Sequence, residues 1–319
     1  MDEPLVSVLT PVYNGEEFLR QCIESVLKQN YENWEYIIVN NCSTDRSLEI
    51  AQKYAGKEPR IKIHNNKTHI GHLENGNLAF QKISSDSMYC KMVHADDWLF
   101  PDCISKMVEI AEKYPTVGIV SSYRLDNKEV NLDGLPYPSH CVSGREIGKR
   151  FLMNREFYFG SPSSTMFRSS LVRKRDSIYN QTNIHSDVTA CLDMLKESDF
   201  GFVHQVLTFT RRHDLSITSK MIVNKSTDMI SRFIELLDYG PYYLSDNELE
   251  TRLRETEKLF YIRLARIIYL SDERNIITKY RAELAALEVQ FKYGKLVKSL
   301  IIEFFKIPIK NLFRLKISY

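Results

Sequence analysis

Two adjacent carboxylates, Asp96 and Asp97, follow the apolar run at residues 88–93 and precede Pro101, which opens the next element. The apolar run is typical of a buried strand, and paired carboxylates at its exit are costly unless cations or several donors satisfy them. In open α/β sheets, ligands bind beyond the carboxyl ends of strands. The pair therefore favours a site for a divalent metal that carries a diphosphate. The alternative is that one of the aspartates caps the helix that begins near Pro101.

An alternation of strands and helices positions this pair. Apolar runs predict strands at Leu5–Tyr13, Trp34–Val39, Arg60–His64, Met88–Val93, Val117–Tyr123 and Phe200–Thr210. Apolar residues at helical spacing predict helices over residues 16–29, 45–54, 73–83, 103–114, 144–153 and 187–195. Strands that alternate with helices of this length imply βαβ units and a mainly parallel sheet.

The composition changes near Ser219, where the strand signals stop. Long helical patterns follow at Thr227–Leu237, Leu249–Leu270 and Ile276–Phe291. We therefore expect an α/β domain over residues 1–219, a helical region over residues 220–291 and a separate tail over residues 292–319.

The tail interleaves apolar residues with lysines and arginines, and Glu303 is its single acid. A basic amphipathic segment of this kind is typical of an interfacial membrane anchor. The alternative is a terminal helix that docks on the helical region or on a second subunit, which would make the protein an oligomer.

The overall composition excludes some classes of function. The 43 Lys+Arg and 41 Asp+Glu nearly cancel, so the chain has no global charge signature of a nucleic-acid-binding protein. Its six cysteines form no Cys-x-x-Cys pair, which suits free thiols in a reducing compartment. The acidic N-terminus is unlike a signal peptide, and no apolar run reaches the roughly 18–20 residues of a membrane span. These features predict a cytoplasmic protein.

Three motifs then occur in order along the chain. Thr10–Asn14 ends the first strand, Asn40–Asp45 follows the second, and the acidic pair follows the fourth. With these motifs, residues 4–215 resemble the family 2 inverting glycosyltransferases, which build bacterial polysaccharides. The resemblance implies the GT-A fold, a Rossmann-like α/β architecture with a mixed, mainly parallel sheet flanked by helices. The C-terminal helical extension lies outside it.

The resemblance implies donor-binding roles for Pro11, Tyr13, Asn14, Glu16 and Asn41. Tyr13 would stack on the nucleotide base, and Glu16 would orient the nucleotide unless it serves only as a first-turn helix acid. Relatives carry an aspartate where Asn41 stands. The Asn41 amide oxygen can still accept from the base, without the strength that a charge adds.

The acidic motif implies a Mn²⁺ or Mg²⁺ site, because both ions take hard oxygen ligands. Asp97 is expected to bind the metal, and Asp96 to contact the ribose or a metal-bound water. His94 stands where longer forms of the motif carry a first acid, and the alternative for it is a strand-end histidine without a catalytic role. Later in the chain, His213 is expected to complete the metal shell and Arg211 to bind the diphosphate; the alternative is an ordinary basic turn.

Asp187 matches the position of the family's catalytic base. An inverting transfer needs one carboxylate to take the proton from the acceptor hydroxyl. The alternative is that Asp187 caps the helix that it begins.

Together these residues predict a metal-dependent inverting glycosyltransferase. Its donor would be a nucleoside diphosphate-sugar, with a UDP-sugar most expected, and its acceptor a hydroxyl of a growing glycan, free or lipid-linked. The basic tail would hold the enzyme at the inner face of the cell membrane. The rival interpretation is a catalytically inactive nucleotide-sugar-binding protein, with Asn40, Asn41 and His94 as traces of lost activity.

Overall fold

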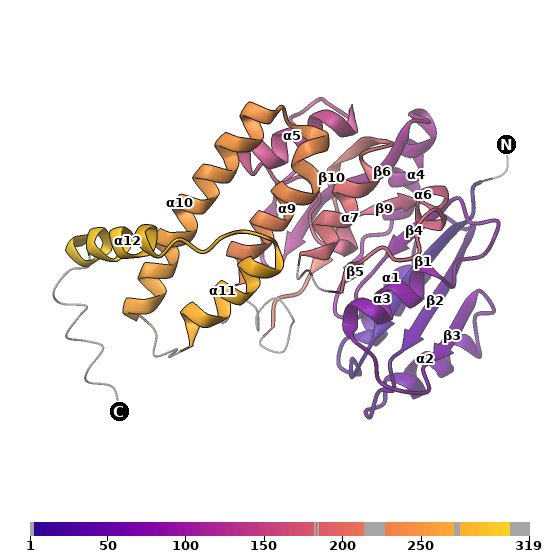
Figure 1. Cartoon of the computed structure of the whole chain (residues 1–319). Coiled ribbons are helices and arrows are strands. Elements are labelled where there is room, and N and C mark those ends of the chain that lie inside the picture. Colours follow the sequence, from indigo (N-terminus) through magenta and orange to yellow (C-terminus); the bar gives the residue numbers. More distant parts are fainter. Residues whose placement is uncertain (1–2, 182, 184, 214–226, 271–274, 307–319) are drawn as a thin grey trace. The chain divides into compact units, whose positions relative to one another are not determined.

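The computed structural model of the 319-residue chain describes residues 3–181, 183, 185–213, 227–270 and 275–306 (Figure 1). The chain divides into two compact units, Met1–Val223 and Asn224–Tyr319. The predicted boundary near Ser219 lies outside the described residues. The predicted separation of residues 292–319 from residues 220–291 stays a prediction.

The first unit is built on one mixed sheet. Its strands are β1 (Val6–Val12), β2 (Trp34–Asn40), β3 (Ile61–Asn65), β4 (Tyr89–Met92), β5 (Trp98–Leu99), β6 (Val117–Asp126), β7 (Glu129–Asn131), β8 (Cys141–Val142), β9 (Met166–Arg168) and β10 (Asp199–Thr210). Within the described residues the order is β3-β2-β1-β4-β9-β6-β10-β5, with β7 beside β6 and β8 beside β10. The neighbours β3-β2-β1-β4 are parallel, whereas β9 runs antiparallel to both β4 and β6. The predicted mixed, mainly parallel sheet is confirmed.

The helices of this unit alternate with most of its strands along the chain. They are α1 (Leu19–Leu27), α2 (Ser47–Ala55), α3 (His72–Phe80), α4 (Cys103–Lys113), α5 (Gly144–Asn154), the 3-10 turn η1 (Pro162–Ser164), α6 (Ser169–Arg173) and α7 (Ser186–Met194). In α1 the buried residues are Leu19, Cys22, Ile23 and Val26, which form one apolar stripe because residues three and four apart share a helix face. This stripe joins α2, α4 and alternate strand residues in one core cluster.

Parallel pairing brings the carboxyl ends of β1, β2 and β4 to one edge of the sheet. All seven residues of β2 are buried, as expected for a central parallel strand covered on both faces. The predicted motifs at residues 10–14, 40–45 and 94–97 begin where these strands end. The fold therefore gathers them at that edge.

The second unit is helical in its described residues. Its helices are α9 (Thr227–Tyr243), α10 (Asp246–Leu270), α11 (Ile276–Ala286) and α12 (Tyr293–Lys306). Phe260, Tyr261 and Leu264 of α10 form a core with Tyr280 of α11 and Leu296 of α12. The predicted helices are confirmed, although α11 ends at Ala286 rather than at residue 291. No helix among the described residues is long and apolar enough to cross a membrane.

Candidate active site

A tight turn between β4 and β5 gathers three side chains that can hold a metal ion. The backbone N–H of Asp97 donates to the carbonyl of His94 at 3.0 Å, which closes the turn. As a result, one ligand atom from each of His94, Asp96 and Asp97 lies within 4.8 Å of the others. We call residues 94–97 the acidic turn. His94 belongs to this group, although the sequence left open whether it is a motif residue or a strand-end histidine without a catalytic role.

Asp97 is buried, and protein donors occupy both of its carboxylate oxygens. Oδ1 accepts from the backbone N–H of Arg211 at 2.9 Å, and Oδ2 accepts from the hydroxyl of Ser163 at 2.6 Å. Burial, with the neighbouring Asp96 carboxylate, raises the pKa of Asp97 to about 6. Asp97 therefore ties the acidic turn to the end of β10 and to η1.

Asp96 has a different environment, because its side chain is partly exposed. Its Oδ2 atom lies 3.0 Å from Nε2 of His213, and the His213 ring packs against Phe18 at a centroid distance of 5.1 Å. The structure thus brings together Asp96 and His213, which lie far apart in the sequence.

Arg211 links the acidic turn to α1. Its Nε donates to the Asp96 carbonyl at 3.0 Å, and its Nη2 donates to Oε1 of Gln21 at 2.6 Å. The guanidinium also lies 4.5 Å from the centre of the Phe18 ring. A diphosphate contact by this guanidinium would replace or share its hydrogen bond to Gln21.

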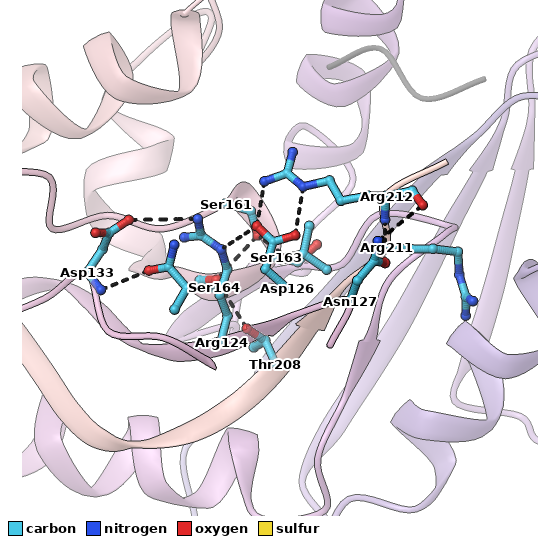
Figure 2. Close-up of polar contacts among 12 residues, drawn as sticks. Arg124, Asp126, Asn127, Asp133, Ser161, Ser163, Ser164, Thr208, Arg211 and Arg212 are labelled. Carbon is cyan, nitrogen blue, oxygen red and sulfur yellow. Dashed lines mark hydrogen bonds and ion pairs between the residues drawn. The ribbon is translucent and has the colours of Figure 1, made fainter. Parts of the chain in front are cut away.

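Arg212, the next residue, pairs with residues at the end of β6. Figure 2 shows Asp126 between Arg124 and Arg212. Asp126 accepts two hydrogen bonds from the Arg212 guanidinium, at 2.7 and 2.6 Å, and Asn127 Oδ1 accepts from the Arg212 backbone N–H at 2.8 Å. These contacts fix the end of β10 to the end of β6. The backbone N–H of Arg211 is thereby held toward Asp97.

Lys91 of β4 is a buried cation that the sequence interpretation missed. Its ammonium donates to the carbonyls of Ser163 and Thr165, the latter at 3.2 Å. Ser163 in turn accepts from the His94 backbone N–H at 3.0 Å. Lys91 thus supports the η1 loop that carries the Asp97 hydroxyl donor. A lysine inside an otherwise apolar strand was the available signal.

Asp187 lies in the first turn of α7, and the N-cap residue of that helix is His185. The alternative role of Asp187 as the N-cap is therefore wrong. Burial is the main cause that raises the pKa of the Asp187 carboxyl, while the Val188 N–H and the nearby His185 and His94 oppose this rise. His94 of the acidic turn is thus one of the groups that act on the Asp187 carboxyl electrostatically.

The residues after β1 form a separate group. Pro11 is paired in register with Val39, and the half-exposed ring of Tyr13 meets His69 edge-on at a centroid distance of 4.4 Å. Asn14, at a φ of 50°, accepts from the Thr44 N–H at 2.8 Å and donates its own N–H to the Ser43 hydroxyl at 3.0 Å. The half-exposed Tyr13 ring therefore lies next to a loop that the hydrogen bonds of Asn14 hold in place.

Glu16 also serves this loop contact. Its backbone N–H donates to Asp45 Oδ2 at 2.9 Å, and its Oε2 accepts from the N–H of Arg46, the N-cap residue of α2, at 3.0 Å. The alternative role of Glu16, an acid in the first turn of its own helix, is wrong, because α1 begins at Leu19. Glu16 contacts the N-terminus of α2 instead.

Asn41 is used internally. Its Oδ1 accepts from the Ile70 N–H at 2.9 Å and from Asn66 Nδ2 at 3.1 Å, while its Nδ2 donates to the Ile70 carbonyl at 2.8 Å. A carbonyl oxygen has two lone pairs, so this geometry leaves none to accept from a nucleotide base. The prediction that Asn41 accepts from the base is therefore not supported by this geometry.

The parallel strands β3-β2-β1-β4 and the acidic turn after β4 define a class, the nucleotide-sugar transferases of the GT-A fold. A family model described as Glycosyl transferase family 2 matches residues 7–176, more than half of the chain. The chain belongs to glycosyltransferase family 2, as the resemblance predicted.

Individual relatives agree with this assignment. An uncharacterized glycosyltransferase of Haemophilus influenzae is 29% identical over 225 residues, which cover 69% of this chain and 84% of that one. The putative glycosyltransferase EpsE of Bacillus subtilis is 36% identical over 159 residues, covering 48% of this chain and 56% of EpsE.

Solved structures confirm the fold. S. aureus TarS 1-349 in complex with UDP-GlcNAc gives a TM-score of 0.57 at 16% identity, covering 93% of this chain and 79% of that one. The mannosyltransferase PcManGT from Pyrobaculum calidifontis, in complex with GDP-Man and Mn²⁺, gives a TM-score of 0.59 at 13% identity, covering 94% and 86%. The predicted GT-A fold with a C-terminal helical region is confirmed.

Proposed function

We propose that this protein is a metal-dependent inverting glycosyltransferase that moves a sugar from a UDP-sugar to a hydroxyl of a growing glycan in surface polysaccharide biosynthesis. The observation that carries the proposal is the geometry of the acidic turn, where one ligand atom from each of His94, Asp96 and Asp97 lies within 4.8 Å of the others. The name of EpsE and the UDP-GlcNAc complex of TarS support the glycan and the donor.

The acidic turn fits a divalent cation, because imidazole and carboxylate groups within 4.8 Å of one another are ligands that Mn²⁺ takes. From this group we propose His94 and Asp96 as ligands, and His213 as a third because its Nε2 lies 3.0 Å from Asp96 Oδ2. Asp97, whose oxygens have protein donors, would instead position the turn, whereas the sequence predicts Asp97 as the metal ligand and Asp96 as a contact of the ribose or of a metal-bound water. A bound Mn²⁺ or Mg²⁺ would balance the charge of the departing diphosphate.

Asp187 would act as the general base. Its carboxylate takes the proton of the acceptor hydroxyl while that oxygen attacks the anomeric carbon, and the bond from this carbon to the diphosphate breaks with its electron pair on the nucleotide. A raised pKa suits this task, because a base is most effective when its pKa approaches the working pH. The Tyr13 ring would offer a stacking surface for the base of the nucleotide.

We propose a lipid-linked glycan at the inner face of the cell membrane as the acceptor. Such an acceptor would keep the enzyme at that surface as a peripheral protein.

The rival is a catalytically inactive nucleotide-sugar-binding protein. It rests on Asn40, Asn41 and His94, which stand where the family resemblance implies acids.

The experiment that separates the two is UDP release from UDP-GlcNAc with Mn²⁺, compared between the wild type and Asp187→Asn. We expect the variant to lose about 10²–10⁴-fold in rate, the usual contribution of a general base. The variant should keep the Mn²⁺-dependent thermal shift that UDP produces. Asp86→Asn, at an exposed aspartate, is the matched control. Binding without release in the wild type would establish the inactive protein instead.

Stability gives a second measurement on the same variant. The folded-state pKa of Asp187 is raised, so the stability linked to its protonated form is present at acidic pH and is lost as the pH rises through that pKa. At neutral pH the charged carboxylate lowers the free energy of unfolding. Asp187→Asn should therefore be more stable than the wild type at neutral pH, with a smaller difference in acid. A variant that is less stable at neutral pH would contradict this assignment.

A further inference from the structure

Helix α12 packs on α10 through an unusual face. Its buried residues are Leu296, Ser299 and Glu303, which lie along one side of the helix. The Glu303 carboxylate is almost fully enclosed and accepts from Arg266 Nε of α10 at 2.6 Å and from Lys306 Nζ at 3.3 Å. The only acid of residues 292–319 is thus turned inward and paired.

The opposite side of α12 is apolar and exposed. Ile301 is 56% exposed and Phe305 is 81% exposed, and the other exposed apolar residues of the helix are Tyr293, Val297, Ile302 and Phe304. In a helix that only packs on its own protein, the apolar stripe faces the core. Here the apolar residues are exposed, although the helix is anchored by an ion pair on its other side.

The exposed charges on this helix all have one sign. The exposed residues of α12 are apolar, glycine or lysine, and the lysines are Lys295, Lys298 and Lys306. Lys295 pairs with Glu257 and Lys306 with Glu303, whereas no ion pair involves Lys298 among the described residues. The sequence beyond the described residues adds Lys310, Arg314 and Lys316 and no acid. A partner that offers apolar contact and negative charge near Lys298 therefore complements this surface.

We propose that the exposed face of α12 docks on a membrane surface that contains anionic lipid, with Ile301 and Phe305 entering the headgroup region and Lys298 contacting lipid phosphates. A second copy of the chain suits the face less well. In a two-fold interface the same patch meets itself, so lysines would approach lysines. This inference does not depend on the proposed transfer reaction, and it names the surface and the lipid class for the membrane contact that the sequence predicts.

The test is sedimentation of the full chain with phosphatidylcholine vesicles that contain or lack phosphatidylglycerol. We expect binding to the anionic vesicles, weakened by salt because surface charges are screened. Ile301→Ser combined with Phe305→Ser should lower the binding constant about tenfold or more, because the inserted apolar area is lost. Lys298→Gln should lower it about fivefold, as expected for one basic residue near the surface.

Leu132→Ser is the matched control, because Leu132 is 67% exposed, between the values for Ile301 and Phe305, but belongs to the first unit. It should bind vesicles as the wild type does, and all variants should keep their melting temperature. Unchanged binding of the Ile301/Phe305 variant would overturn the proposal. A second result would also overturn the proposal: the wild type is a dimer in solution, the Ile301/Phe305 variant is a monomer, and neither binds vesicles. The exposed face of α12 would then be a contact between two copies of the chain.

Discussion

Two polar clusters at the same edge of the sheet use their side chains in opposite ways. In the loops after β1 and β2, the side chains of Asn14, Glu16 and Asn41 form hydrogen bonds that join one loop to another. In the acidic turn, the carboxylates of Asp96 and Asp97 lie close together, and burial raises the pKa of Asp97. The first cluster is satisfied without a ligand, whereas the second carries electrostatic cost that a cation would relieve.

This difference suggests a division of labour. The loops after β1 and β2 form a preorganised frame whose exposed part is the Tyr13 ring. The acidic turn keeps repulsive groups together, which a protein retains where it needs them for binding or chemistry. Changes in the first cluster should therefore alter mainly stability, and changes in the second mainly metal binding and catalysis.

The largest effect on this comparison is expected within the acidic turn itself. Asp96→Asn should lower the affinity for Mn²⁺ by at least about 100-fold. Loss of a residue that supports a metal ligand lowers metal affinity by about 10–100-fold, and loss of a direct ligand should lower it at least as much. Asp97→Asn should lower it only about tenfold, since Asp97 would act through the position of the turn. Calorimetric titration with Mn²⁺ in the presence of UDP measures both.

Asp86→Asn, on the exposed loop before β4, controls for the general loss of one negative charge. The opposite order, with Asp97→Asn the weaker binder, would restore the roles that the sequence predicts.

An intermediate effect is expected at the hydroxyl that supports Asp97. Ser163 and Ser164 are both fully buried, but Ser163 donates to a carboxylate at 2.6 Å while Ser164 pairs with the neutral Thr208 hydroxyl at 3.1 Å. Ser163→Ala should lower the free energy of unfolding by about 1–3 kcal/mol, because a buried charged oxygen loses its donor. Ser164→Ala should cost about 1 kcal/mol.

Urea denaturation at neutral and acidic pH checks this pair. The loss in Ser163→Ala should shrink in acid, because a protonated Asp97 depends less on a donor. The loss in Ser164→Ala should not depend on pH in this way. Equal losses at both pH values would show that the two hydroxyls have the same role.

The sequence was sufficient for the order of the main strands and helices, because each carries its own apolar periodicity. It missed β5, β7, β8 and β9, which have two or three residues each, and α6, which has five, since such short elements show no period. The Asp pair and Asp187 were found from local motifs.

The uses of Asn41 and Asp97 could not be predicted from local sequence. Their partners Ile70, Ser163 and Arg211 lie 29, 66 and 114 residues away along the chain, so only the fold reveals them. A sequence shows which side chains are suited to a task. It does not show which of them are already occupied by a distant neighbour.

The smallest effect tests the satisfied cluster. Glu16→Ala should lower the free energy of unfolding by about 1 kcal/mol, because Arg46 loses the acceptor that completes the N-terminus of α2. Glu17→Ala, at the adjacent exposed glutamate, should have little effect. UDP affinity should change no more in Glu16→Ala than in the control, because the Glu16 carboxylate serves the loop rather than the nucleotide. A large loss of UDP affinity at unchanged stability would move Glu16 into the donor site and weaken the contrast between the two clusters.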